Sequence, residues 1–177
     1  MEAIRNIKTT GTVWPSSPHL IRKMLSAIDF DKADYIVEFG VGNGNITREL
    51  LENMKPGSKL LAFEINGQFY QQQKDELKDE RLVLINDSAE EIETYLKRLH
   101  ISKVNYVVSG LPLTNLGKTF CESLLTKTHK ILPKNGKYIQ FQYSLSQYNL
   151  IKKHFSKVKI KFTALNIPPA VVYVCSK

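Results

Sequence analysis

The chain has 177 residues, of which 42% are hydrophobic and 24% charged, and its formal net charge is +8. This length and apolar content suit one domain with a buried core, so we expect a single domain over 1–177, with an arm and helix at 1–30 and a core at 31–177. No run approaches roughly 18 apolar residues and no signal-peptide pattern opens the chain, so we expect a cytoplasmic protein, neither membrane-spanning nor secreted.

Charge is divided unevenly along the chain. Residues 1–95 carry 11 Lys/Arg and 16 Asp/Glu, whereas residues 96–177 carry 14 Lys/Arg and a single acid, Glu122. This asymmetry predicts an anionic partner for the second half, either an anionic membrane surface or phospholipid, or, less favoured, nucleic acid. A solvated lysine-rich surface is the simpler alternative. Nothing in the pattern predicts an obligate protein partner.

The cysteines and histidines form no ligand motif. Cys121 lies in a helical pattern and Cys175 in a strand pattern, and the four histidines are scattered. We therefore expect two buried free thiols and no metal site.

Apolar runs and helical patterns alternate along the chain. Helices are expected at 18–28, 45–54, 67–78, 89–100, 119–132 and 146–155. Strands are expected at 35–40, 59–65, 82–87, 104–110, 136–143, 157–165 and 170–176. The alternation predicts a doubly wound α/β fold, a mostly parallel seven-stranded sheet between two helical layers. The link at 166–169 is too short for a crossover helix, so the last two strands should form an antiparallel hairpin.

The segment before the first strand combines a loop with an amphipathic helix. Ser16 or Ser17 precedes Pro18, which predicts a capped helix with proline in its first turn. The loop before them holds the only tryptophan, Trp14. The first dozen residues mix apolar and basic side chains, a composition suited to contact with a substrate or a membrane.

A glycine turn follows the first strand. Glu38 lies within that strand, and glycines follow at 40, 42 and 44, just before a predicted helix. Glycine allows tight turns and close backbone approach, and the helix N-terminus presents unpaired N–H groups to a ligand. The spacing is G-x-G-x-G, unlike the dinucleotide fingerprint, and there is no Walker lysine. An ordinary strand–helix connection is the alternative for the turn taken alone.

Acids also end the next two strands. Glu64, followed by Ile65, ends the second strand 20 residues after Gly44, where a carboxylate can accept both ribose hydroxyls. Asp87, followed by Ser88, ends the third. Helix capping would explain either acid alone, but three acidic strand tips in order favour a cofactor site.

These motifs resemble motif I and the following acids of class I S-adenosylmethionine-dependent methyltransferases. The resemblance implies a Rossmann-like methyltransferase fold, S-adenosyl-L-methionine as the cofactor, and a bond from Asp87 to the adenine amino group. The cofactor-binding residues that it implies are Glu38, Gly40, Gly42, Gly44, Glu64, Ile65, Asp87, Ser88, Ser109 and Leu111.

The end of the fourth strand, Ser109 to Leu113, bears on the methyl acceptor. Methyltransferases that act on exocyclic base amines carry Asn or Asp, any residue, Pro and an aromatic here, so that the amide polarises the amine and the aromatic stacks on the base. Aligned through Pro112, this chain has Gly110 and Leu113 at those two positions. Ser109 is the remaining polar side chain at this tip.

Three segments resemble the small bacterial phospholipid N-methyltransferases: 13–17, 109–112 and 166–170. The resemblance implies methyl transfer to the amine of phosphatidylethanolamine by a protein that sits peripherally at the inner face of the membrane. Substrate contacts would come from Trp14, Ser16, Ser17 and Pro112. Trp14 departs from the family pattern, which more often has a small residue there.

Ser109 and Tyr143 are the catalytic candidates. Tyr143, at the end of the fifth strand, could bind the amine or relay its proton, or simply close the sheet edge. Two other functions remain open. The related ribosomal RNA adenine dimethyltransferases share the sheet but usually add a helical RNA-binding domain, so a nucleic-acid adenine N6-methyltransferase is one. A non-catalytic, cofactor-binding membrane module is the other, and the intact acids argue against it.

Overall fold

A computed structural model describes residues 16–177; Trp14 lies outside this range. One seven-stranded sheet runs in the order β3-β2-β1-β4-β5-β7-β6. The strands are β1 (Tyr35–Phe39), β2 (Lys59–Phe63), β3 (Leu82–Ile85), β4 (Tyr106–Ser109), β5 (Lys137–Gln142), β6 (Lys157–Thr163) and β7 (Ala170–Ser176). Neighbouring strands are parallel from β3 to β5, and β7 runs antiparallel to both β5 and β6.

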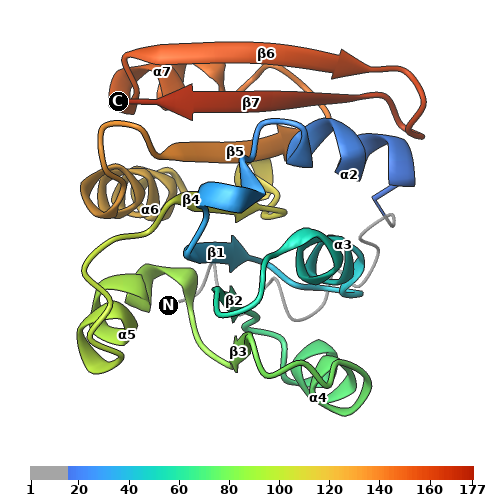
Figure 1. Ribbon diagram of the computed structural model, residues 1–177. Helices are drawn as coiled ribbons and strands as arrows, with labels where there is room; N and C mark the ends of the chain where they lie inside the picture. The colour runs from blue at the N-terminus through green and yellow to red at the C-terminus, as the bar shows by residue number, and fades with distance from the viewer. Residues whose placement is uncertain (1–15) are drawn as a thin grey trace.

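Helices cover both faces of the sheet (Figure 1). The helices are α2 (Pro18–Leu25), α3 (Asn45–Asn53), α4 (Gly67–Glu76), α5 (Ile92–Arg98), α6 (Lys118–Ile131) and α7 (Tyr148–His154). Short 3-10 turns are η1 (Phe30–Lys32), η2 (Ala89–Glu91) and η3 (Leu113–Asn115). The side chains of α2 and α3 pack on one face and those of α5, α6 and α7 on the other, which produces two separate apolar cores. The predicted three-layer α/β fold with its terminal hairpin is confirmed.

The differences from the predicted elements lie at their ends. Most strands stop one to two residues early at their carboxyl ends: Gly40, Glu64 and Gly110 directly follow the last strand residue, and Asp87 comes two residues after it. These residues leave the sheet because their backbone turns into the loops that line its carboxyl edge. The helix expected at 18–28 ends at Leu25, and the one expected at 89–100 is split into η2 and α5.

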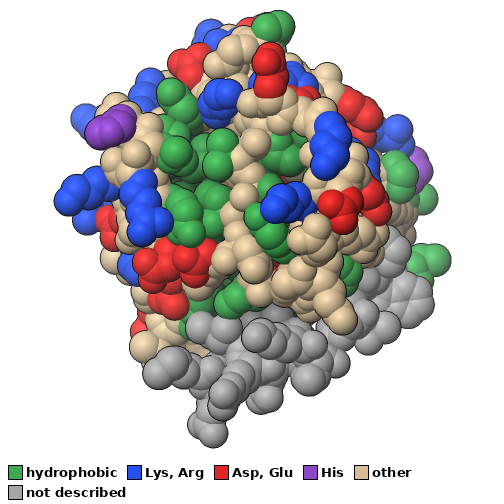
Figure 2. Space-filling view, turned by 90° about the horizontal axis from the view of Figure 1, so that it is seen from below, with side chains coloured by type: hydrophobic (Ala, Val, Ile, Leu, Met, Phe, Trp, Pro, Cys, Tyr) green, Lys and Arg blue, Asp and Glu red, His purple; other side chains and the backbone are tan. Residues whose placement is uncertain are grey.

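The two edges of the sheet differ in charge. Seen from the β3 edge, acidic and basic side chains are interspersed around a central group of hydrophobic ones (Figure 2). The opposite edge strand, β6, carries Lys157, Lys159 and Lys161 and no acid. Three of the lysines of the second half of the sequence therefore lie together on this edge strand.

Candidate active site

The acidic strand ends lie side by side. β1, β2 and β3 are consecutive parallel neighbours in the sheet, so their carboxyl ends share one edge. In this register Glu38 lies beside Ala62 of β2 and Val108 of β4. Gly42 of the glycine turn donates its backbone N–H to the Glu64 carboxylate at 2.8 Å. The turn after β1 and the acid after β2 are thus joined directly.

Glu38 is fully buried, and neither of its carboxylate oxygens has a hydrogen-bond partner among the described residues. Burial raises the pKa of Glu38 to about 8, and the charge of Glu64 raises it further. The nearby Thr47 hydroxyl partly opposes this rise, although it makes no hydrogen bond among the described residues. A buried carboxyl without partners is costly to the fold alone, because it loses water and gains nothing. It is explained if a ligand with donor groups or positive charge completes the site.

Glu64 is nearly buried and oriented by the backbone. Its Oε2 accepts the Gly42 N–H, and its Oε1 accepts the Asn66 N–H at 2.7 Å. Burial raises the pKa of Glu64, and the N–H groups of Gly42 and Asn66 oppose that rise. A carboxylate oxygen can accept more than one hydrogen bond, so each oxygen keeps capacity for a second donor. Two adjacent hydroxyls, as on a ribose, match that capacity.

The three glycines of the turn have different surroundings. All have positive φ, at 79° for Gly40, 53° for Gly42 and 73° for Gly44, which other residues adopt at a cost. A Cβ at Gly40 would lie 2.9 Å from Leu111 Cδ2, and one at Gly44 would lie 2.1 Å from Gln73 Oε1. A Cβ at Gly42 would meet nothing within 4 Å. Gly42 therefore borders the open space in which a ligand would approach the backbone.

The acid after β3, Asp87, is held by two hydrogen bonds. Ser88 donates its backbone N–H to Asp87 Oδ1 at 2.7 Å, and the Tyr95 hydroxyl donates to Oδ2 at 3.1 Å. Tyr95 packs edge-on against Phe63 with ring centroids 5.5 Å apart. Ser88 also caps η2, where its Oγ accepts the Glu90 N–H. Asp87 therefore performs a local structural role and still presents carboxylate oxygens at the sheet edge.

The segment after β4 is fixed by close backbone packing. A Cβ on Gly110 would lie 3.1 Å from the Gly40 carbonyl oxygen, so the chain has little room for a side chain there. Ser109 is buried, and its Oγ accepts the Leu111 N–H at 3.3 Å. Leu113 is 1% exposed and packs in the core, so it presents no surface at this edge.

Two glutamines of β5 hold the same segment. The side-chain amides of Gln140 and Gln142 both donate to the Leu111 carbonyl, at 3.0 and 2.9 Å. The Tyr138 hydroxyl donates to Gln140 Oε1 at 2.5 Å, which fixes the orientation of that amide. Sequence reasoning missed both glutamines. The sequence contains a sign of their role: side chains two residues apart on a strand lie on the same face, and two buried amides on that face need hydrogen-bond partners.

Ser17, one of the predicted substrate residues, contacts the β6–β7 turn. Ser17 caps α2: its Oγ accepts the Leu20 N–H at 3.2 Å and donates to the Leu165 carbonyl at 3.0 Å. Its own N–H donates to Asn166 Oδ1 at 3.0 Å. Two segments 149 residues apart, which carry the phospholipid-methyltransferase resemblance, are therefore in contact. Ser16 and Pro112 are half-buried, and their roles stay predictions.

Tyr143 follows β5 and is 42% exposed. Burial of its hydroxyl raises its pKa, and the Asn166 side chain partly opposes this. The phenol is therefore protonated at neutral pH. It can donate or accept a hydrogen bond but is not a phenolate base.

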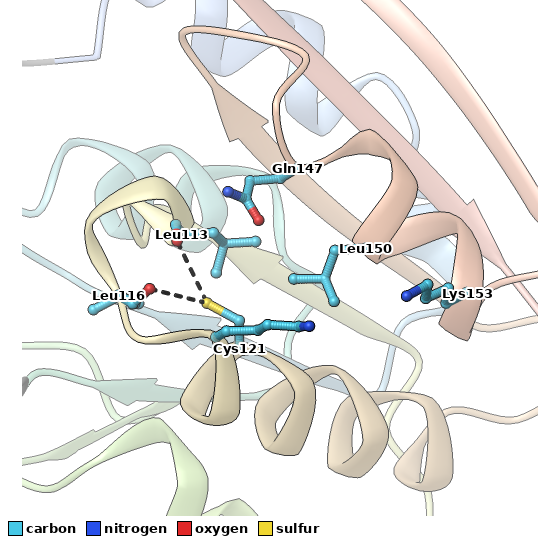
Figure 3. Close-up of a pocket in the computed structure, with 7 residues that line it drawn as sticks. Leu113, Leu116, Cys121, Gln147, Leu150 and Lys153 are labelled. Atoms are coloured by element: carbon cyan, nitrogen blue, oxygen red, sulfur yellow. Dashed lines mark hydrogen bonds between the residues drawn. The ribbon is translucent and has the colours of Figure 1, made fainter.

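A cavity of about 290 Å³ lies next to this edge, between η3, α6 and α7 (Figure 3). Leucines 113, 116 and 150 line it together with Cys121, Gln147, Lys118 and Lys153. The Cys121 thiol donates to the Leu113 carbonyl at 3.4 Å, and burial raises its pKa to about 11. Both predicted free thiols are indeed buried. Its lining mixes apolar side chains with two lysines and a glutamine, and it includes none of the three acids.

A family model for ribosomal RNA adenine dimethylase matches residues 8–156. The chain belongs to the ribosomal RNA adenine dimethylase family. Its similarity to an ornithine lipid N-methyltransferase of Singulisphaera acidiphila is 25% identity, over 91% of this chain and 85% of that one. It is also 23% identical to ribosomal RNA small subunit methyltransferase A of Mycoplasmopsis synoviae, over 88% of this chain but 61% of that protein.

Solved structures show the same fold. A precorrin-6y C5,15-methyltransferase from Geobacter metallireducens aligns with a TM-score of 0.74 at 15% identity, over 94% of this chain and 91% of that one. Human N-acetylserotonin methyltransferase, solved in complex with SAM, aligns with a TM-score of 0.69 at 14% identity, over 99% of this chain and 56% of that one. The expected class I methyltransferase fold is confirmed.

This family member is an S-adenosylmethionine-dependent methyltransferase. The residues present fit the cofactor, because the unpaired buried Glu38, the free acceptor capacity of Glu64 and the open space at Gly42 face one edge. Within residues 16–177 no group of three His, Cys, Asp or Glu side chains is placed to hold a metal. No helix in that range is long and apolar enough to cross a membrane.

Proposed function

We propose that this methyltransferase transfers a methyl group from S-adenosylmethionine to the headgroup amine of a membrane lipid, with phosphatidylethanolamine as the first acceptor to test. The β4 segment carries the proposal. A base amine needs an amide or acid and a stacking aromatic, and here Gly110 has no side chain while Leu113 is buried in the core. An aliphatic primary amine needs neither, because it is nucleophilic once it has lost its proton.

The protein's contribution is positioning. S-adenosylmethionine supplies an electrophilic methyl on a sulfonium; the new carbon–nitrogen bond forms as the carbon–sulfur bond breaks. Glu38, Glu64 and Asp87 would hold the nucleoside and amino-acid parts of the cofactor. The Leu111 segment, fixed by Gln140 and Gln142, would present its backbone to the acceptor. Holding two reactants in line accounts for a large share of catalysis in reactions of this kind.

The acceptor must reach the site as a neutral amine. An ammonium headgroup loses its proton before attack. The Tyr143 phenol can relay that proton, since its oxygen can take the ammonium proton as its own O–H proton passes to water. Ser109 is buried and engaged with the Leu111 N–H, which favours a role in shaping the segment rather than in proton transfer. Both assignments are proposals.

The similarity to the lipid-modifying relative supports this function. It extends over 85% of that protein, whereas the ribosomal RNA methyltransferases of Caldanaerobacter subterraneus and Mycoplasmopsis synoviae match over 35% and 61% of their lengths. Methylation of ribosomal RNA adenine is the second candidate, supported by the family itself and by the basic second half of the chain. Gly110 and Leu113 disfavour this candidate, because they supply neither the amide or acid nor the stacking aromatic that a base amine needs.

An acceptor competition decides between them. The protein is incubated with radiolabelled S-adenosylmethionine and with phosphatidylethanolamine vesicles, ornithine lipid vesicles and small-subunit ribosomal RNA in one reaction, and the lipid and RNA fractions are counted separately. We expect label in a lipid fraction. Label in RNA alone would overturn the lipid proposal and favour the second candidate.

A further inference from the structure

Most of the strongly exposed large apolar side chains of residues 16–177 lie just after β5 and around the β6–β7 turn. Of the large hydrophobic residues that are strongly exposed in residues 16–177, only Leu99 lies outside the segment from the end of β5 to the start of β7. Four of them form what we call the apolar edge: Leu145 (53% exposed), Phe162 (60%), Leu165 (67%) and Ile167 (79%). Clustering of this kind marks an interaction site more often than chance exposure does.

The apolar edge lies at the end of the sheet where the candidate active site opens. β7 begins at Ala170, and its next residue, Val171, pairs with Gln142 at the carboxyl end of β5. The Tyr173 hydroxyl donates to the Ser144 carbonyl at 3.1 Å, which ties the loop containing Leu145 to the hairpin. In Figure 1 the β6–β7 turn projects beyond the ends of β1 and β5 on the same side as their arrowheads.

Buried polar contacts hold the turn in place. Asn166 is 3% exposed; its Oδ1 accepts the Ser17 N–H, and its Nδ2 donates to the Pro168 carbonyl at 2.7 Å. Leu165, on one side of this anchor, is fixed through its carbonyl by the Ser17 hydroxyl. Because the anchor points inward, the side chains of Leu165 and Ile167 on either side of it are presented outward. A docking surface that is already ordered loses less entropy on binding.

Lysines stand next to the apolar edge, and the part of the chain that forms this edge contains no acid. Lys23 Nζ donates to the Phe162 carbonyl at 3.1 Å, and Lys161 Nζ donates to Ser26 Oγ at 2.8 Å. Burial lowers the pKa of Lys161, and the charges of Lys137, Lys23 and Lys159 lower it further. Residues 123–177 contain no Asp or Glu. Anionic groups would relieve this repulsion among lysines.

We propose that the apolar edge inserts into the headgroup layer of an anionic bilayer while the neighbouring lysines pair with lipid phosphates, so that the β4 segment faces the membrane. This inference rests on the proposed lipid acceptor. Aliphatic tips flanked by lysines suit the boundary between headgroups and acyl chains. Residues 99–177 contain no arginine, the side chain best suited to bidentate contacts with bases, which favours a lipid surface over RNA.

Site-specific fluorescence tests the contact. Because Cys121 and Cys175 are buried, Ile167→Cys creates a single accessible thiol for a nitrobenzoxadiazole label. Leu99→Cys is the matched control, because Leu99 is also exposed but follows α5, outside the apolar edge. Vesicles of phosphatidylglycerol and phosphatidylcholine should raise the fluorescence of the label on Ile167→Cys severalfold and leave that of the label on Leu99→Cys nearly unchanged. Added salt should reduce the increase seen with Ile167→Cys. Equal responses at both positions, or a response at 167 to structured RNA but not to vesicles, would overturn the proposal.

A second variant separates docking from chemistry. Leu165→Ser with Ile167→Ser keeps the backbone anchor and should lower the vesicle partition coefficient on the order of tenfold, whereas Leu99→Ser should not. Methyl transfer to lipid dissolved in detergent micelles should be unchanged in the double variant, while transfer to vesicles falls. Unchanged vesicle binding refutes the docking surface even if lipid is methylated. Normal docking by a wild-type protein that methylates no lipid supports the surface and removes the proposed function instead.

Discussion

The buried carboxyl of Glu38 leads to a quantitative prediction for Glu38→Gln. The pKa of this group rises from 4.5 to about 8 in the folded protein because the charged form is cut off from water. Between those values the folded chain holds a proton that the unfolded chain has released, so wild-type stability falls as pH rises. At about 1.4 kcal/mol for each pKa unit, the cost to the wild type is roughly 3 kcal/mol near pH 7.

Urea unfolding of the wild type and of Glu38→Gln from about pH 5 to about pH 8 measures this. With each pH unit across that window, the free energy of unfolding of the wild type should fall by about 1.4 kcal/mol relative to that of Glu38→Gln, and the difference should level off above it. Glu52→Gln, a change at an exposed acid of α3, is the matched control. A pH-independent difference between the wild type and Glu38→Gln would refute the assignment of a buried, unpaired carboxyl.

The cofactor site and the segment contacts yield three more predictions. Glu64→Ala should abolish calorimetric binding of S-adenosylmethionine, because Gly42 and Asn66 lose their acceptor and the ribose its partner. Gly42→Ala should weaken that binding at least about tenfold. Gly57→Ala, also at positive φ (78°) and equally open, should only lower stability by about 1 kcal/mol. Asn166→Ala should destabilise the fold by about 1–3 kcal/mol in urea unfolding, since it leaves the Ser17 N–H without its acceptor.

Each of these has a contrary outcome. Unchanged binding in Glu64→Ala would place the cofactor elsewhere. Equal losses of affinity in Gly42→Ala and Gly57→Ala would mean that backbone strain, not the space at Gly42, is responsible. A free energy of unfolding equal to that of the wild type in Asn166→Ala would show that the contact between Ser17 and Asn166 does not stabilise the fold.

The sequence was sufficient for the fold because the physical signals were local. Continuous apolar runs marked buried parallel strands, and the short Asn166–Pro169 link forced the last two strands to be antiparallel. Acids at successive strand ends could be placed together for the same reason, since parallel neighbours end at one edge. The close contact between Glu64 and Gly42 follows from that topology.

Other features depend on contacts that no local pattern reveals. Gln140 and Gln142 meet Leu111 only because β4 and β5 are neighbours in a particular register. Ser17 was expected to cap a helix or to contact substrate; that it also binds Asn166 required the full chain to be folded. The apolar edge was equally hidden, because Leu165 and Ile167 look like ordinary strand-end residues until the burial of Asn166 turns them outward.

The central claim is that this fold carries a methyl group from S-adenosylmethionine to a lipid amine. Mass spectrometry of the lipid fraction, after incubation with trideuteromethyl-labelled S-adenosylmethionine and vesicles that contain phosphatidylethanolamine, addresses it most directly. We predict headgroups heavier by whole trideuteromethyl groups with the wild-type protein and unmodified headgroups with Glu64→Ala. Unmodified lipid with the wild type, while ribosomal RNA added to the same mixture gains the label on adenine, would contradict the account.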